Sequence, residues 1–225
     1  MPGSSPVPLI GLCLLWLIPG SAWAATQAYT IDPGQSDLHW RVYRSGPLGR
    51  LGHNHVIAAH GLSGQVDLAP DGSARFNLAF PVSRLEVDNP VLRRRYGPDF
   101  DSGLSARDRA ATRANMLGPA LLNSARFGQI RLSGSASIPT GRGPHQLTIP
   151  ADITIAGRRV RVLVPATVQR TGRGLRARGN FSLTHRQLGL RPFSAAMGAL
   201  RVAERIDFTF DIQAQGPRPA HSRRE

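Results

Sequence analysis

Two histidines stand two residues apart in the segment 51–57, LGHNHVI, directly behind a glycine. In an extended chain such side chains share one face, so His53 and His55 would point the same way. An imidazole nitrogen can ligate zinc, copper or haem iron, and it can also hydrogen-bond a polar ligand, a backbone carbonyl or water. The pair therefore predicts either part of a metal site or polar groups at the mouth of a binding site.

A metal site would need a third ligand from another strand. His185 is the best candidate, because it continues an inward series that begins with Phe181 and Leu183. His39 and His60 are less suitable, and His39 alternates with apolar residues that we expect in the core. No acidic residue stands beside the pair, which argues against a hydrolytic zinc centre. A metal- or redox-linked module built on His53, His55 and His185 is thus the alternative hypothesis, and no resident metal is expected.

Nucleophilic catalysis has little support in the sequence. No Gly-x-Ser-x-Gly elbow is present, and any pairing of a serine with a histidine and an aspartate would be arbitrary. We therefore assign no catalytic residue and expect a binding protein.

The elements that must position these histidines are strands. Apolar and polar residues alternate with a period of two in runs separated by turn residues, which is typical of antiparallel strands that cover a core on one face. About eight such runs predict an all-β, antiparallel barrel, a size that can enclose one small ligand. The apolar positions that we expect on its inner wall are Leu38, Trp40, Val42, Phe76, Leu78, Phe80, Ile130, Leu132, Phe181, Leu183, Phe208 and Phe210.

The alternation stops between residues 83 and 124. Ser105 and Asp108 have the spacing of a capping box, and good helix formers follow until Gly118, which predicts one helix. The preceding residues, 87–103, are expected to be an inserted loop that covers a mouth, engages a partner or is simply solvated. The loop holds an arginine cluster, in which Arg94 is a candidate contact for a ligand head group.

Charge is strongly positive, since 28 basic residues face 14 acidic ones, and every basic residue is an arginine. Arginine binds phosphate groups with a planar fork, so an anionic membrane surface is one candidate partner. A composition bias spread over solvated strand faces is the other explanation. Nucleic acid is not expected, because no recognition helix or stacking aromatic residues accompany the arginines.

The first 24 residues predict a cleaved secretory signal. Residues 9–18 are apolar but too short to span a bilayer, and Ala22 and Ala24 form a small-x-small cleavage site. Cys13, the single cysteine, would leave with this signal. We expect an exported, periplasmic protein with one domain at 25–215 and a polar, basic tail at 216–225.

Several segments in order resemble the YceI-like family of exported, polyisoprenoid-binding proteins. They are YTIDPGQS at 29–36, ARD at 106–108, RFGQIRL at 126–132 and GNFSLTHRQLGL at 179–190. The resemblance covers nearly the whole mature chain, and it implies a lipocalin-like barrel that holds an isoprenoid or isoprenoid-quinone ligand, without another cofactor. The insertion at 89–103 and the LGHNHVI segment depart from the family pattern.

Overall fold

A computed structural model describes residues 25–101, 103–141 and 143–216. The predicted signal, residues 1–24, and the predicted tail beyond Gly216 lie outside these residues. The strands are β1 (Gln27–Ile31), β2 (Asp37–Ser45), β3 (His55–Ala59), β4 (Ser63–Leu68), β5 (Ser73–Pro81), β6 (Leu85–Val87), β7 (Gln129–Ser137), β8 (Pro144–Ile155), β9 (Arg158–Arg170), β10 (Gly174–Thr184), β11 (Ser194–Ala195) and β12 (Leu200–Gln215). The helices are α1 (Pro90–Arg94) and α2 (Ala106–Leu117), with short 3-10 turns η1 (Gly49–Leu51), η2 (Val82–Arg84) and η3 (Ala196–Gly198).

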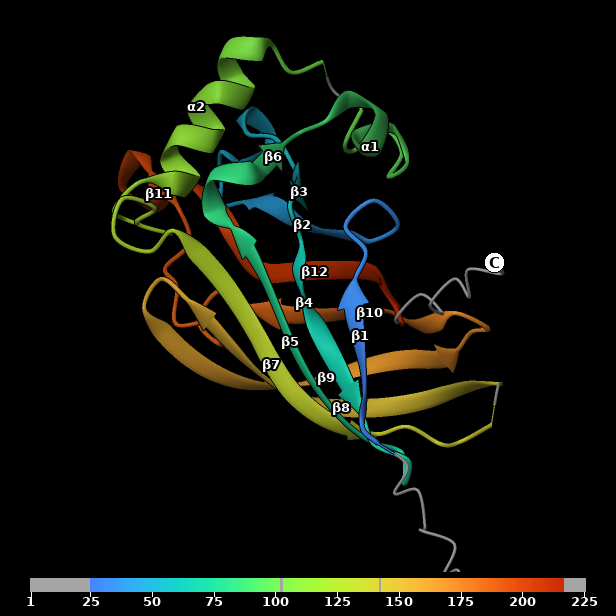
Figure 1. Cartoon of the computed structure of the whole chain (residues 1–225). Coiled ribbons are helices and arrows are strands. Elements are labelled where there is room, and N and C mark those ends of the chain that lie inside the picture. Colours follow the sequence, from blue (N-terminus) through green and yellow to red (C-terminus); the bar gives the residue numbers. More distant parts are fainter. Residues whose placement is uncertain (1–24, 102, 142, 217–225) are drawn as a thin grey trace, which may run out of the picture.

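Eight antiparallel strands close into a barrel, as Figure 1 shows. Their order is β1, β4, β5, β7, β8, β9, β10 and β12, and β1 pairs with the end of β12 to complete the ring. This confirms the predicted all-β, lipocalin-like barrel of about eight strands. Short turns after β4, β8 and β9 join each of these strands to its antiparallel neighbour.

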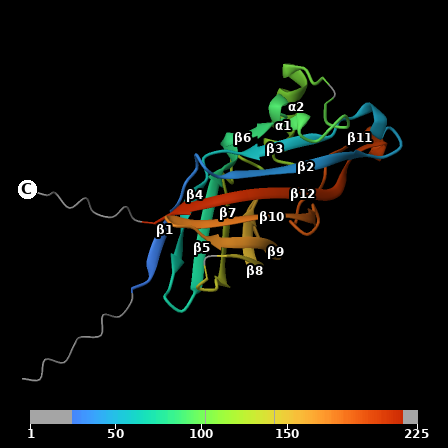
Figure 2. The same ribbon diagram turned by 90° about the vertical axis from the view of Figure 1, so that its right-hand side faces the viewer.

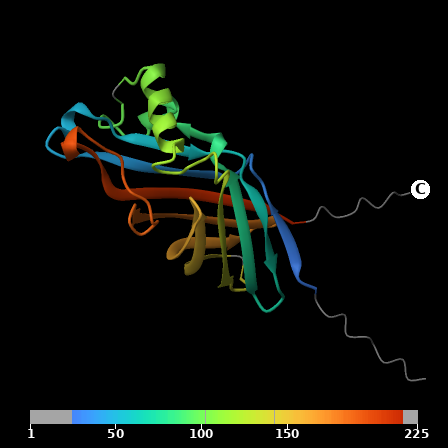
Figure 3. The ribbon, with the colours of Figure 1, turned by 90° about the vertical axis from the view of Figure 1, so that its left-hand side faces the viewer.

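Three further strands, β2, β3 and β6, continue the sheet beyond β12. Strand β12 pairs with β2, β2 with β3, and β3 with β6, which follows β5 directly through η2. Figures 2 and 3 show β2 and β12 running together beyond the rest of the barrel as a long two-stranded arm. The apolar side chains of β2 and β3 consequently extend the inner wall.

One strand and one helix do not follow from the alternation alone. Strand β8 runs through Pro150, which stands between its apolar residues Leu147 and Ile153. Pro150 is paired in register with Leu163 of β9, so the missing N–H interrupts one hydrogen bond without breaking the strand. A second helix, α1, lies inside the segment that was expected to be a loop.

Helix α2 crosses one end of the barrel (Figure 1). The predicted capping box is confirmed: the Ser105 hydroxyl accepts from the Asp108 N–H, and the Asp108 carboxylate accepts from the Ser105 N–H. Arg113 fixes the helix by donating to the carbonyls of Ser83 and Leu85 at 2.6 and 3.1 Å. Met116 is buried against the barrel core. We call the end that α2 covers the mouth end.

The buried apolar residues form two groups on opposite faces of β2 and β3. The large one fills and lines the barrel. The small one, which we call the outer cluster, consists of Val56, Ala58, Leu92 and Phe100, with Tyr43 and Tyr96 packed against them. Residues 87–101 thus lie on the outside of the wall, which corrects the expectation that the segment covers the mouth or is simply solvated. Among the described residues, no helix has the length and apolar character needed to cross a membrane.

Candidate functional site

A cavity of about 860 Å³ occupies the barrel. Its size lies within the usual range for pockets that hold small molecules, roughly 300–1,000 Å³. Every predicted wall residue lines it except Leu183, which is buried in the same core without facing the cavity. The period of two therefore identified the side of these strands that faces the cavity, and the binding of a ligand by these residues stays a prediction.

A row of aromatic rings runs across three neighbouring strands of the wall. Phe181, Phe208 and Trp40 are directly paired neighbours on β10, β12 and β2. The rings of Phe181 and Phe208 are stacked with centroids 5.0 Å apart, and Trp40 lies 5.9 Å from Phe208. Stacked rings on rigid, paired strands provide a flat apolar surface against which a hydrocarbon chain can pack.

Polar side chains are distributed unevenly around the cavity. Most of those on its lining lie at the mouth end, on β3, on α2 and in the segment that follows β10. They are His55, Thr112, Asn115, His185, Arg191 and Ser194, while Asn77 and Arg176 lie elsewhere. The deep end is lined by residues such as Ile31, Ile138 and Ala214. A molecule with one polar end and one long apolar end would fit this arrangement in a single direction.

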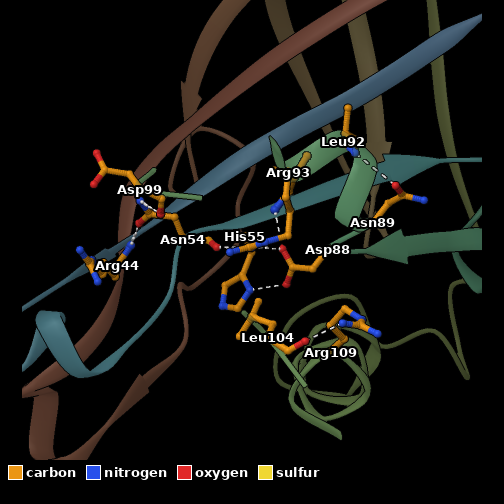
Figure 4. Close-up of polar contacts among 11 residues, drawn as sticks. Arg44, Asn54, His55, Asp88, Asn89, Leu92, Arg93, Asp99, Leu104 and Arg109 are labelled. Atoms are coloured by element: carbon orange, nitrogen blue, oxygen red, sulfur yellow. Dashed lines mark hydrogen bonds and ion pairs between the residues drawn. The ribbon is translucent and has the colours of Figure 1, made fainter. Parts of the chain in front are cut away.

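His55 is held in place from the outer side of the wall, as Figure 4 shows. Its Nδ1–H donates to the Asp88 carboxylate at 2.6 Å, and the Val56 N–H donates to the same carboxylate at 3.0 Å. Arg93 donates to Asp88 at 2.5 Å and to the Asn54 carbonyl at 2.6 Å. Because Nδ1 is bonded to this carboxylate, Nε2 is the ring nitrogen left for a polar ligand, and it has no protein partner among the described residues.

Asp88 is the centre of this network. Its side chain is fully buried and its φ is 58°, a left-handed conformation that aspartate and asparagine adopt more readily than most residues. Burial acts to raise the pKa of Asp88, but hydrogen bonds from His55, Val56 and Arg93 outweigh it and lower the pKa below its usual value. The carboxylate therefore stays charged and sets the orientation of the His55 ring.

Sequence reasoning missed Asp88 and Arg93. The signal for them was the run Asp88-Asn89-Pro90, since asparagine before proline is a typical helix start. The structure places Asn89 at the N-cap of α1, where its side chain accepts from the N–H groups of Val91 and Leu92. That short helix is what turns Arg93 back toward Asp88.

His185 is the second imidazole on the cavity lining. It is buried, and a hydrogen bond of 3.1 Å joins its Nδ1 to the Glu204 carbonyl. Burial lowers the pKa of His185, which outweighs the opposite effect of the Glu204 and Ala203 carbonyls. The ring is therefore neutral at pH 7.

The other predicted mouth residues do not reach the cavity. His53 precedes β3, is exposed and does not line the cavity, so it does not share the inner face with His55. Arg94 is exposed on α1, outside the wall. Within the described residues, no three His, Cys, Asp or Glu side chains are grouped so that they could hold a metal ion. The geometry therefore does not favour the triad of His53, His55 and His185.

The outward face of β2 also differs from expectation. His39 and Arg41 alternate with wall residues, as predicted, but they do not face open solvent. A hydrogen bond joins His39 Nε2 to the Tyr96 hydroxyl, and the Arg41 guanidinium lies 4.3 Å from the Tyr96 ring centre. Arg41 belongs to a network around the buried Asp207 carboxylate, which also accepts from Tyr43.

Comparisons with known proteins agree with this fold. The profile of the YceI-like domain family matches residues 29–214. A polyisoprenoid binding domain from Saccharophagus degradans, implicated in plant cell wall breakdown, is 12% identical with a TM-score of 0.57, covering 85% of this chain and 99% of its own. BcnA from Burkholderia cenocepacia is 15% identical with a TM-score of 0.56, covering 82% and 99%. At these identities the structural similarity establishes the fold alone. A search of curated protein sequences finds no match.

Proposed function

Because the chain belongs to the YceI-like family, we propose that it is a binding protein, and not an enzyme, that holds one long apolar lipid inside its barrel. The observation that carries the proposal is the cavity of about 860 Å³ with an almost wholly apolar wall. The polyisoprenoid binding domain from Saccharophagus degradans, with the same fold, supports an isoprenoid chain as the tail.

The free energy of binding would come from moving the tail out of water. Each methylene-sized group that leaves water contributes about 0.8 kcal/mol before the costs of association. Affinity should therefore rise with the number of isoprene units and level off when the cavity is full. This dependence on chain length is expected of an apolar tunnel and not of a site that recognises the head group alone.

The polar mouth end supports a defined orientation, with the head of the lipid near His55 and the tail among the aromatic rings. His55 Nε2 is free to bond a ligand, so the head group that fits best is a hydroxyl, which can both donate to and accept from this nitrogen, such as that of a prenol or of a reduced isoprenoid quinone. We propose that the carrier is exported and works in the periplasm, on the basis of the cleavage site that ends at Ala24.

Native mass spectrometry of protein purified from its own source without added lipid tests the proposal. We expect one lipid per chain in the wild type. Ala177 lines the cavity and Arg178 next to it is exposed, so tryptophan at either position gives a matched pair on β10. Ala177→Trp should lose the lipid, and Arg178→Trp should keep it. Wild-type protein without lipid, or a folded Ala177→Trp variant with a full complement, would contradict the proposal; circular dichroism reports the fold.

A further inference from the structure

Two loops from distant parts of the sequence are joined at the end of the β2–β12 arm. We call them the tip, residues 46–52 and 193–199. The Leu48 N–H of the first loop donates to the Ala199 carbonyl of the second at 2.9 Å. The second loop is itself closed by the Val202 N–H, which donates to the Phe193 carbonyl at 3.0 Å. A Cβ at Gly46, where φ is 91°, would lie 2.5 Å from the Ala199 oxygen, so only glycine permits this close approach. Figures 2 and 3 both show the turn after β2 beside β11.

The tip carries most of the large apolar side chains that are exposed in the described chain. Leu51 is 67% exposed and Met197 fully exposed, and Leu48 and Phe193 are also in contact with solvent. The two other exposed large residues, Val91 and Leu163, lie apart from the tip on α1 and β9. Clustered exposed apolar residues on a soluble fold are typical of a surface that meets a protein or a membrane.

One of these exposed residues, Met197, has a backbone conformation that is unfavourable for a residue other than glycine. Met197 has φ 52° and ψ 34°, a left-handed conformation that costs a residue other than glycine about 1–2 kcal/mol. Its side chain is fully exposed. Strain of this kind is concentrated at functional sites, where the surrounding structure maintains it.

Charge around the tip is predominantly positive, and the nearest acidic residue along the chain is Glu204, whose carboxylate accepts from the Arg186 N–H. Residues 44–53 and 186–203 contain no aspartate or glutamate. Their arginines are all exposed and are Arg44, Arg50, Arg186, Arg191 and Arg201. Apolar side chains surrounded by guanidinium groups complement a surface that has an apolar interior and a layer of phosphates.

The tip is continuous with the lipid cavity. The four residues 191–194 and Val202 are part of the cavity lining, so Phe193 belongs both to the exposed surface and to the mouth end. A membrane in contact with the tip would therefore lie next to the cavity and not against the closed end of the barrel.

We propose that the tip docks the protein onto an anionic phospholipid bilayer. Leu51, Met197 and Phe193 enter the boundary between headgroups and acyl chains, while Arg50 and Arg201 contact phosphates. The mouth end then faces the membrane, from which a lipid enters the cavity. That loading step rests on the proposed function, whereas the docking does not.

Flotation with vesicles tests the apolar part of the surface. The wild type should float with vesicles of phosphatidylcholine mixed with phosphatidylglycerol, and far less with phosphatidylcholine alone. Leu51 and Met197 do not line the cavity, so the double variant Leu51→Gln, Met197→Gln leaves the lipid site untouched. It should lose most of the flotation, whereas Val91→Gln, Leu163→Gln, which removes two exposed apolar residues elsewhere, should float as the wild type does.

A second pair of variants tests the charge. Arginine near an anionic surface contributes about 1 kcal/mol to binding, so Arg50→Gln, Arg201→Gln should weaken binding to the mixed vesicles about thirtyfold. Arg75 and Arg178 are exposed on β5 and β10, away from the tip. Arg75→Gln, Arg178→Gln has the same net charge as the first variant and should bind within about threefold of the wild type.

The outcomes separate docking from cargo binding when native mass spectrometry accompanies flotation. Tip variants that keep their lipid but no longer float support both proposals. Tip variants that float like the wild type overturn the docking, whatever the cargo. A wild type that floats but carries no lipid overturns the proposed function and leaves the docking intact. If the wild type is a dimer and Leu51→Gln, Met197→Gln is a monomer with unchanged flotation, the tip is an interface between copies and the docking is wrong.

Discussion

The two faces of β2 and β3 have different surroundings, a cavity on one side and packed side chains on the other. The inner face carries Leu38, Trp40, Val42 and Ile57 toward a cavity that the protein itself does not fill. The outer face is packed under residues 87–101, where the outer cluster adjoins the buried Asp88 and Arg93. Side chains that border a cavity make few packing contacts on that side, so the rigidity of the wall has to come from packing on its outer face. The outer face also holds the carboxylate that orients His55 on the inner face.

This difference predicts that the outer face is the more sensitive to mutation. Asp88→Asn keeps the size of the side chain and a residue suited to the left-handed backbone, but it removes the buried carboxylate charge that binds Arg93, His55 and the Val56 N–H. Loss of one partner of a buried ion pair costs about 3–5 kcal/mol. Urea unfolding should show this loss.

The control for Asp88→Asn is Asp152→Asn, because among the described residues Asp152 pairs with the exposed guanidinium groups of Arg159 and Arg161. Exposed pairs contribute little, so this variant should be much closer to the wild type. Equal losses in the two variants would show that the Asp88 network does not stabilise the wall.

Leucine to alanine changes on the two faces sharpen the comparison. Leu92 is buried in the outer cluster, so Leu92→Ala should leave a new cavity and cost about 3 kcal/mol. Leu38 already faces the lipid cavity, so Leu38→Ala only enlarges an existing space and should cost about 1 kcal/mol. Unfolding of lipid-free protein gives both values, and a larger loss for Leu38→Ala would reverse our interpretation.

Tyr43 tests a single polar contact on the outer face. Its hydroxyl donates to Asp207 at 2.5 Å, and Asp207 also accepts from Ser182 and Arg205. Tyr43→Phe removes one of these donors and should cost about 1–2 kcal/mol, as measured by urea unfolding at neutral pH.

The ionisation of Tyr43 gives an independent measurement. Burial, followed by the hydrogen bond to Asp207, raises the pKa of Tyr43 from 10.0 to about 12. The folded state thus keeps a proton that the unfolded state loses, so this contribution to stability is complete below pH 10.0 and disappears as the pH rises through about 12. Phenolate absorbance should show one late tyrosine, which Tyr43→Phe removes.

The smallest effect is expected at His185 on the cavity side. Burial lowers the pKa of His185 below its ordinary value of 6.5, so the unfolded state binds the proton first. Stability from this group is present above pH 6.5 and is lost as the pH falls through the lower pKa of the folded state. The proton resonances of His185 should therefore titrate below pH 6.5, and His185→Asn should make stability less dependent on pH over this range. A titration midpoint of His185 above pH 6.5 would contradict this prediction.

The inner face could be predicted from the sequence and the outer face could not. Alternation identifies which residues of β2 point the same way, so Trp40 and Val42 were assigned to the wall correctly. It does not say whether the opposite side meets water or protein, because His39 and Arg41 look like solvated positions in either case. The residues that cover them lie in the segment 87–101, which has no period of two. Alternation also does not place His53, because the side on which its ring lies depends on where β3 begins.

Strand β12 has a consequence for the order in which the molecule assembles. It hydrogen-bonds β10 on one side and both β2 and β1 on the other, so it joins residues 27–45 to residues 200–215. Contacts between such distant parts of a chain form slowly, and here the barrel cannot close during synthesis before residue 200 has emerged. Until then β2 and β10 each have an unpaired edge, which other chains can join. The chain is therefore most prone to aggregation in that interval.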